Sequence, residues 1–168
     1  MTIALAAFAI FAALLVAVAV IDARRMIIPD ELNIAITMTG LAASYVTGTP
    51  QLVSALAGMI VGGALLGIVR LQFRMRRGFD GLGLGDVKFA AAAGVWTGID
   101  DLAPALFCAS LLCLLFMLVK WSSGRPVTRM LKVPFGPFLA LGAGLIAGWH
   151  AAVGASATET IATLLSAH

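Results

Sequence analysis

Six long apolar runs recur along this chain and constrain its fold more than any other feature. Most of them are close to the length that crosses a bilayer as a helix, roughly 20 residues. They cover residues 2–21, 31–47, 52–69, 86–98, 102–119 and 133–149. Because 61% of the 168 residues are hydrophobic and only 11% are charged, a soluble domain could not bury the apolar surface. The sequence predicts an all-α polytopic membrane protein with about six transmembrane helices, built as one domain over residues 1–168.

This composition also excludes several classes of function. It argues against a soluble enzyme, a disordered chain and a nucleic-acid-binding protein, and the net charge of +3 is better explained by membrane topology. The two cysteines, Cys108 and Cys113, lie five positions apart, so a helix does not place them on one face. They form no CxxC pair, and the sequence predicts no zinc site, no other metal site and no cofactor.

The basic residues indicate how the chain is oriented in the bilayer. Segments 22–33, 70–88 and 120–132 contain all 11 Lys and Arg residues, whereas the alternate segments carry Asp100, Asp101 and Glu159. Cytoplasmic loops are enriched in Lys and Arg, so the amino end is expected outside. The first run resembles a signal peptide in part, but no basic residue precedes it and Arg24-Arg25 follow it, which favours a true span.

Small and polar residues within the runs suggest how the helices pack. The third run contains Gly58-x-x-x-Gly62 and Gly63-x-x-x-Gly67, a spacing that lets helices approach closely. We interpret it as packing within the chain, with a dimer motif as the alternative. The fourth run is short, so its glycine-rich entry is expected to enter protein-lined membrane depth. The tail from His150 to His168 is expected to be a loop and a marginal helix.

Five acidic residues fall on the expected cytoplasmic side, and each has a structural explanation. Asp22 follows the first run and could pair with Arg25, while Asp86 begins the fourth run and could cap that helix. Asp30 and Glu31 suit the first turn of the second helix, where the helix dipole favours acids, and Asp80 is expected to be solvated in a loop.

Asp22 and Asp86 also have a functional interpretation, because both are expected at one depth near the inner membrane face. Two carboxylates within a few ångströms cannot easily both ionise, so they share a proton. One can then act as a base on water while the other polarises a scissile carbonyl, which cleaves a peptide bond without a covalent intermediate. The titration would belong to the pair rather than to either residue. Spacing in the sequence does not show that the two side chains meet.

Two segments rich in glycine and proline frame these acids. In Gly81-x-Gly83-x-Gly85 no strand precedes and no Lys-Ser/Thr follows, which argues against nucleotide binding. Glycines instead allow an extended substrate to lie against the backbone beside Asp86. Two prolines flank a glycine in Pro134-Phe-Gly136-Pro, which predicts a fixed, non-helical approach to the last run. That approach could serve packing or form one wall of a substrate groove.

Three motifs together resemble the type IV prepilin peptidase family of membrane aspartic proteases. Asp22-Ala-Arg-Arg-Met-Ile-Ile-Pro29 resembles its first aspartate motif, and Gly83-Leu-Gly85-Asp86-Val-Lys88 resembles its second, Gly-x-Gly-Asp-x-Lys. Val133-Pro-Phe-Gly-Pro-Phe138 resembles its third segment. Gly-x-Gly-Asp alone is shared with presenilin-type proteases, whereas all three motifs in this order are specific. The resemblance covers about Asp22 to Gly142.

The resemblance implies that Asp22 and Asp86 are the catalytic pair of a bacterial inner-membrane peptidase. It implies removal of a short basic leader from prepilins or pseudopilins, with cleavage after a glycine at the cytoplasmic face. The residues expected to shape the substrate site are Gly83, Gly85, Pro134, Phe135 and Gly136. Asp30, Glu31 and Asp80 could offset the basic loops near a basic leader, and Lys88 could be an interface cation or orient Asp86.

One departure and two rival functions qualify this prediction. Bifunctional members carry a segment with paired cysteines linked to N-methylation, and this sequence has no cysteine pair, so we expect peptidase activity only. The first rival is a Gly-x-Gly-Asp intramembrane protease of other substrates. The second is a small transporter or a scaffold of a pilus or secretion machine, although the acids cluster at one face rather than at the midplane. The sequence leaves the oligomeric state open.

Overall fold

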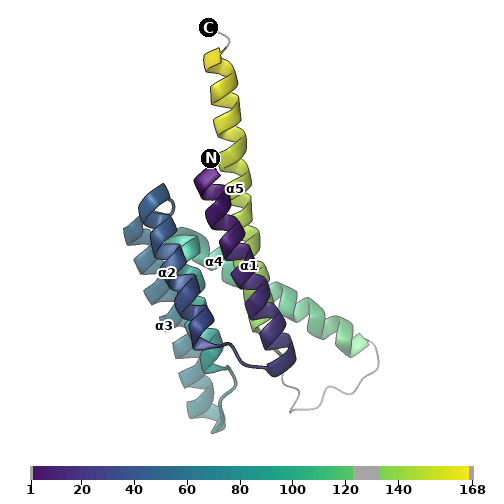
Figure 1. The fold of residues 1–168 in the computed structure, drawn as a ribbon. Coiled ribbons are helices and arrows are strands. Elements are labelled where there is room, and N and C mark those ends of the chain that lie inside the picture. Colours follow the sequence, from purple (N-terminus) through teal and green to yellow (C-terminus); the bar gives the residue numbers. More distant parts are fainter. Residues whose placement is uncertain (1, 123–132, 167–168) are drawn as a thin grey trace.

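The computed structural model describes residues 2–122 and 133–166, with side chains described for residues 3–122 and 133–152. Every regular element in these ranges is an α-helix, which confirms the predicted all-α class (Figure 1). The helices are α1 (Thr2–Arg25), α2 (Asp30–Thr47), α3 (Leu52–Arg77), α4 (Leu84–Ser122) and α5 (Gly136–Ser166). Each of the six apolar runs therefore lies in a helix, except that residues 133–135 of the sixth run precede α5.

Two helices extend well beyond the predicted runs. α3 continues to Arg77, about two turns past the predicted end at Val69, and these turns carry a basic cluster. α5 continues from Gly136 to Ser166, so the prediction of a loop in the tail is wrong for most of that segment. The marginal helix expected there is a continuation of α5, because no Gly-Pro break follows Trp149 to stop it.

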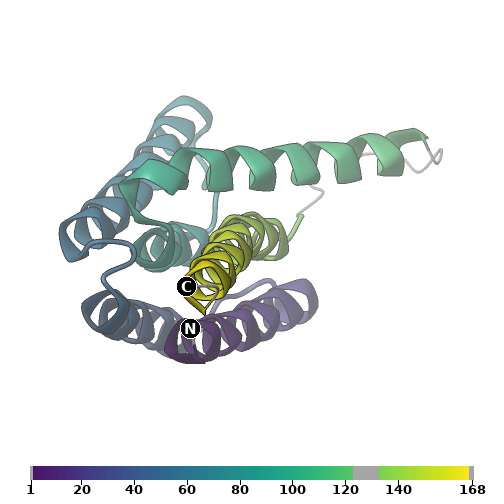
Figure 2. The same ribbon diagram turned by 90° about the horizontal axis from the view of Figure 1, so that it is seen from above.

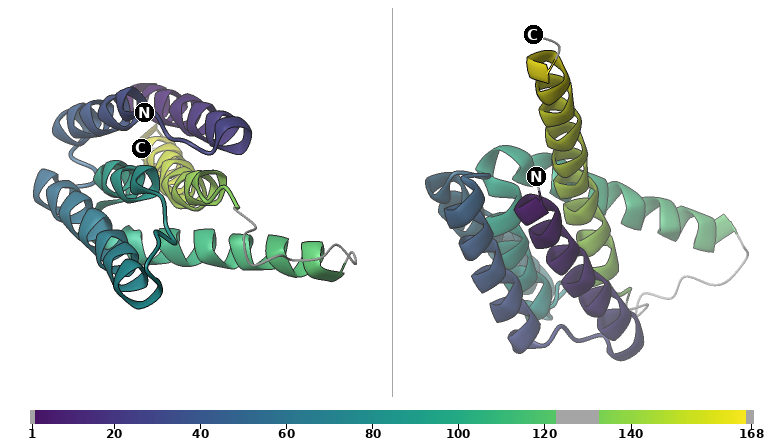
Figure 3. Two further views of the ribbon diagram at one scale, coloured as in Figure 1. Left: turned by 90° about the horizontal axis from the view of Figure 1, so that it is seen from below. Right: turned by 45° about the horizontal axis from the view of Figure 1, so that its top comes forward.

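Gly98 bends α4 at the boundary that separates the fourth and fifth predicted runs. Its φ of 69° and ψ of 179° are open to glycine and strained for any other residue. The hydroxyl of Ser54 accepts the backbone N–H of Ile99 at 3.1 Å, which satisfies an amide freed at the bend. The two predicted spans are thus halves of one bent helix, and beyond its contact with α5 the second half extends away from the other helices (Figures 2 and 3).

The first half of α4 is the centre of the molecule, because its small residues let α3 approach closely. Gly58 faces the backbone of Gly94, and Gly62 faces the backbone of Ala90, so that a methyl group on either glycine would overlap a main-chain carbonyl. Gly58 and Gly62 are buried. This contact between two helices of one chain confirms that the Gly-x-x-x-Gly pattern packs the fold internally.

Larger side chains join the remaining helices to this centre. The ring of Phe11 on α1 stacks on Trp96 at 4.3 Å, and the indole N–H of Trp96 donates to the carbonyl of Ile36 on α2 at 2.9 Å. α5 crosses the second half of α4 where Gly142 meets Ala105 and Ala109. The core of the molecule therefore lies between α1, α2, α4 and α5.

The outer surface is apolar, as in a membrane protein. α1, α3 and α4 are long and apolar enough to cross a bilayer, and the apolar part of α5 covers Gly136–Ala152. Many large apolar side chains of these helices are exposed, among them Val16, Ile60 and Leu114. Lipid would remove these side chains from water, whereas an aqueous solvent would not.

One end of the bundle collects most of the basic residues of the described helices. α1 and α3 end there and α2 and α4 begin there (Figure 1). Lys88 at the start of α4 donates to the carboxylate of Asp30 at the start of α2, with Nζ–Oδ2 of 2.7 Å. Arg24, Arg25 and the basic residues of the last turn of α3 lie at the same end. We refer to it as the basic end.

Candidate active site

A cavity of about 230 Å³ opens at the basic end between the last turn of α1 and the first turn of α4. Asp22 and Asp86, which are 64 positions apart in the sequence, both line it. The lining residues are Asp22, Met26, Ile27, Ile28, Gly83, Leu84, Gly85 and Asp86. The cavity is therefore an apolar recess with two acidic groups, large enough for a short stretch of peptide backbone and water.

Asp22 is held at the amino end of α5. Its side chain is buried, with 5% of the residue exposed, and its Oδ2 accepts the backbone N–H of Gly136 at 3.0 Å. Gly136 is the first residue of α5, so the carboxylate meets both an otherwise unpaired amide and the positive end of the helix dipole. A Cβ at position 136 would lie 2.7 Å from that Oδ2, so this contact requires a glycine.

Asp86 occupies the third position of α4, and its carboxylate accepts the backbone N–H of Gly83 just before the helix. This return contact from the third helical residue is one half of a capping box. A Cβ on Gly83 would lie 2.8 Å from Oδ2 of Asp86, so a glycine is needed here as well. The capping and catalytic interpretations of Asp86 are therefore compatible in one geometry.

The two carboxylates interact electrostatically across the cavity. Neither forms an ion pair with a basic side chain in the described part of the chain, so the alternative pairing of Asp22 with Arg25 is not observed there. A helix amino end stabilises each charge instead. Two carboxylates that line one recess without a neutralising cation in the described residues repel each other, which favours a state in which one of them keeps its proton.

The connection between α1 and α2 forms one wall of the cavity. Met26 takes a left-handed φ of 55°, and its N–H donates to the carbonyl of Asp22 at 2.8 Å, which ends α1 directly after the basic pair. The buried Ile28 then packs on Gly85, where a Cβ would lie 3.2 Å from that of Ile28. The space left by the missing side chains is thus filled by the carboxylate of Asp86 at Gly83 and by Ile28 at Gly85.

Four of these lining residues, namely Met26, Ile27, Ile28 and Leu84, were not predicted from the sequence. Their positions in the sequence could have identified them. Three lie in the short connection between Asp22 and Pro29, and one lies inside the glycine segment. A connection of so few residues cannot leave the neighbourhood of Asp22. Residues that follow a candidate catalytic acid in so short a connection can therefore be predicted to line its site.

The predicted proline-phenylalanine-glycine segment contributes unequally. Gly136 donates a hydrogen bond to Asp22, but none of Pro134, Phe135 and Gly136 lines the cavity. Phe135 packs against the hydrophobic core, and its carbonyl accepts the N–H groups of Phe138 and Leu139, both at 3.1 Å. Phe135 therefore starts α5 and thereby places the Gly136 amide, while Pro134 lies just outside that first turn.

Two acids at the basic end form ion pairs that were not predicted from the sequence, although Asp30 lies in the first turn of α2 as expected. Asp30 pairs with Lys88, and Asp80 pairs with Arg70 at 2.6 Å and with Arg74 at 3.9 Å. Both carboxylates stay partly exposed, and they find these partners because helix ends and the connection after α3 meet at the basic end. Lys88 binds Asp30 rather than Asp86. Lys88 and Asp86 are linked only by their neighbouring positions at the start of α4.

Comparison with known proteins identifies the family of the chain. A model of the type IV leader peptidase family matches residues 9–118. Leader peptidase HopD of Escherichia coli is 35% identical over 134 residues, which are 76% of this chain and 82% of that protein. The chain belongs to the type IV leader peptidase family. The matched range includes Asp22, Gly83, Gly85 and Asp86 and ends before the start of α5.

Bifunctional relatives of the leader peptidase family match over a similar range. The prepilin leader peptidase/N-methyltransferase of Xanthomonas campestris pv. campestris is 36% identical over 140 residues, and that of Aeromonas hydrophila is 34% identical over 137 residues. These ranges are 80% and 82% of this chain. The chain spans 45% of the length of each of these two relatives. No solved structure matches the chain.

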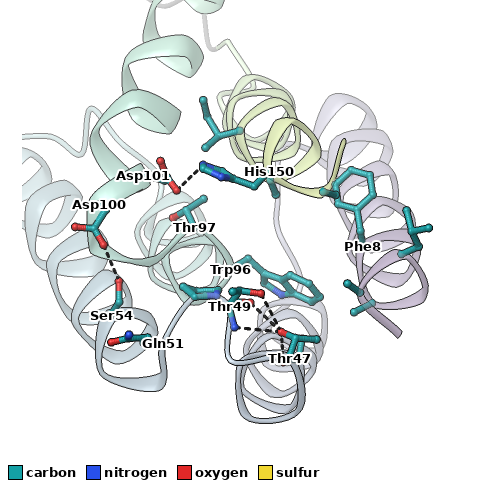
Figure 4. A pocket seen from close by; sticks show the side chains of 18 residues that line it. Phe8, Thr47, Thr49, Gln51, Ser54, Trp96, Thr97, Asp100, Asp101 and His150 are labelled. Atoms are coloured by element: carbon teal, nitrogen blue, oxygen red, sulfur yellow. Dashed lines mark hydrogen bonds and ion pairs between the residues drawn. The ribbon is translucent and has the colours of Figure 1, made fainter. Parts of the chain in front are cut away.

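A larger pocket of about 710 Å³ lies at the opposite end of this leader-peptidase fold (Figure 4). His150 pairs with Asp101 there at 2.8 Å, and the Ser54 hydroxyl donates to Asp100 at 3.3 Å. These contacts join α5 and α3 to the bend of α4. No residue predicted for the catalytic or substrate site lines this pocket. The 230 Å³ cavity is therefore the candidate active site, although it is the smaller of the two.

Proposed function

We propose that the chain is a prepilin leader peptidase, an aspartic endopeptidase that removes the short basic leader of type IV prepilins or pseudopilins. Cleavage is proposed to follow a glycine at the cytoplasmic membrane face. Family membership and the names of the relatives support this activity. The observation that carries the assignment of residues is the cavity that Asp22 and Asp86 line together.

In the proposed mechanism, one aspartate is ionised and the other carries a proton. The ionised carboxylate takes a proton from water as the water oxygen attacks the carbonyl carbon of the scissile bond. The protonated carboxyl donates to the carbonyl oxygen, and a proton passes to the amide nitrogen as the C–N bond breaks. The backbone N–H groups of Gly83 and Gly136 hold the two acids throughout, so the pair needs little reorganisation.

The substrate is proposed to enter over the glycine segment. The backbone of Gly83 and Gly85 lines the cavity beside Asp86, and the connection of residues 26–28 faces it. A peptide bound in the cavity would reach both acids, because Asp22 and Asp86 line it together. Gly136, with Phe135 and Pro134 behind it, acts by holding Asp22 rather than by forming an extended groove wall.

We propose a bacterial inner-membrane location with the amino end outside and the catalytic cavity at the cytoplasmic face. The gathering of basic residues at the end that carries Asp22 and Asp86 supports this orientation. A reporter fused at Gly48, which joins α2 to α3 at the opposite end, is expected to be active only as an external reporter. The matched fusion at Gly78 is expected to report the cytoplasm, and the reverse pattern would contradict the orientation.

The proposed activity is tested by expressing the chain together with a type IV prepilin in cells that lack their own leader peptidase. The expected product is a pilin whose new amino end follows the leader glycine, as measured by mass spectrometry. A prepilin with that glycine replaced by a bulky residue is the matched control and should stay uncut. An intact prepilin beside well-inserted protein would show that the proposed substrate class is wrong.

The same mass measurement tests the expectation of peptidase activity without N-methylation. The cysteines Cys108 and Cys113 are free thiols in the second half of α4, distant in sequence from both aspartates. We therefore expect the new amino end to carry no added methyl group. A product heavier by one methyl group in the cells described above would contradict this part of the proposal.

A further inference from the structure

The connection between α3 and α4, residues 78–83, carries the glycine segment into the catalytic cavity. Gly78 ends α3 with a left-handed φ of 74°, and its N–H donates to the carbonyl of Arg74 at 2.9 Å. The chain then returns along the end of α3 to Gly83 (Figure 1). Because Gly83 contacts Asp86 directly, the path of this connection sets the position of a proposed catalytic group.

An ion pair fastens this connection to α3. Arg70 donates to Oδ2 of Asp80 at 2.6 Å, and Nε of Arg74 lies 3.9 Å from Oδ1 of the same carboxylate. The side chain of Arg70 is 20% exposed, and its Nη1 is buried without a hydrogen-bond partner in the described residues. The side chain of Arg70 is thus largely shielded from water where it binds Asp80, and its Nη1 donor is left unpaired, which costs free energy.

An aromatic contact fastens the next residues to the same helix. Gly81 lies against the ring of Phe73 so closely that a Cβ would overlap the ring. Phe79 meets Phe73 edge-on, with the ring centroids 5.4 Å apart. Arg70, Phe73 and Arg74 are spaced three and four positions apart, so they share one face of α3. An ion pair and aromatic contacts therefore hold the connection against one face of α3.

We propose that Arg70, Phe73 and Asp80 form a latch that positions Gly83 and Asp86 for catalysis. They are positioning residues, because their contacts with the cavity pass through the connection rather than to the reacting atoms. This inference rests on the proposed peptidase activity. A partly exposed ion pair adds little to the global stability of a protein, so its loss should act locally on the glycine segment.

The latch competes with a second role for Asp80, which is direct binding of basic side chains of the leader. The two roles predict opposite effects of removing Arg70. If Asp80 binds the leader, removing its partner frees the carboxylate and lowers KM. If Asp80 closes the latch, removing either partner should have the same effect, because both changes open the same ion pair.

The experiment compares prepilin cleavage by Asp80→Asn, Arg70→Gln and the charge-reversed pair Arg70→Asp with Asp80→Arg, in purified protein reconstituted in vesicles. We expect each single variant to lower kcat by about tenfold with KM within about twofold, since small misplacement of a catalytic group is costly. The reversed pair should recover most of kcat. The matched control is Arg76→Gln, which changes an exposed arginine in the last turn of α3 and should retain full activity.

A second measurement is independent of activity. Amide hydrogen exchange of residues 79–83 should rise in Asp80→Asn and Arg70→Gln, and should return towards wild type in the reversed pair. Raised KM with unchanged exchange, or a reversed pair no better than the singles, would overturn the latch. If the wild-type chain does not cleave prepilin, the proposed function fails while the exchange measurement still decides whether the latch exists.

Discussion

Replacing either aspartate of the cavity by asparagine should abolish leader removal. Asp22→Asn and Asp86→Asn are each expected to lower kcat by about a thousandfold or more, because an amide cannot carry the proton that the pair exchanges. The asparagine carbonyl can still accept the N–H of Gly136 or Gly83, so the fold should survive. The measurement is the rate of prepilin cleavage at saturating substrate, with equal amounts of inserted protein.

The double variant makes this test sharper. Residues that act as one unit are not additive, so Asp22→Asn with Asp86→Asn should be no slower than the single variants. The matched control is Asp101→Asn, which removes a carboxylate at the opposite end of the bundle, where it pairs with His150. That control should keep near-normal cleavage. Leader removal that survives in either single variant would show that the dyad is not the catalytic centre.

Adding one methyl group at position 136 should disable the site nearly as severely. The Cβ in Gly136→Ala would lie 2.7 Å from Oδ2 and 3.0 Å from Cγ of Asp22, so the carboxylate must leave its hydrogen bond to the Gly136 amide. We expect kcat to fall by about a hundredfold, since a shift of about 1 Å in a catalytic group has effects of this size. KM should change little, because the substrate contacts proposed for Gly83 and Gly85 remain.

The control for this variant lies two turns along the same helix. In Gly144→Ala the nearest atom to the added Cβ is the flexible Cδ1 of Leu15 at 3.1 Å, distant from both aspartates. This variant should match Gly136→Ala in helix propensity and insertion while it keeps its activity. The parallel change at Gly83, 2.8 Å from Asp86, should resemble Gly136→Ala. Equal activity of Gly136→Ala and Gly144→Ala would show that the hydrogen bond to Asp22 is unimportant.

Charge patterns carried much of the functional prediction. The one-sided placement of Lys and Arg predicted that the ends of runs bearing Asp22 and Asp86 lie at one face, and both residues line one cavity in the structure. The Gly-x-x-x-Gly spacing likewise predicted a close helix contact, which α3 makes with α4. These patterns are local, and each depends on solvation or on side-chain size at fixed helical spacing.

Side-chain pairings between different elements of the fold were beyond prediction. The pairing of Asp80 with Arg70 and of Asp30 with Lys88 depends on how helix ends converge in space. The bend at Gly98 depends on Ser54 of another helix, whose hydroxyl accepts the amide of Ile99. A glycine within an apolar stretch is compatible with a straight helix, a bend or a chain reversal, so only its packing selects among them.

The sequence by itself determined that this chain is a helical membrane protein with two acids at its basic end, because hydropathy and charge act residue by residue. Only the tertiary structure decided how those acids are held. Asp22 receives its hydrogen bond from Gly136, which is 114 positions away, and the helix that carries Asp86 is reached by a connection bound to α3. Such contacts form when the amino end of one helix packs against the last turn of another, and no local pattern specifies that meeting.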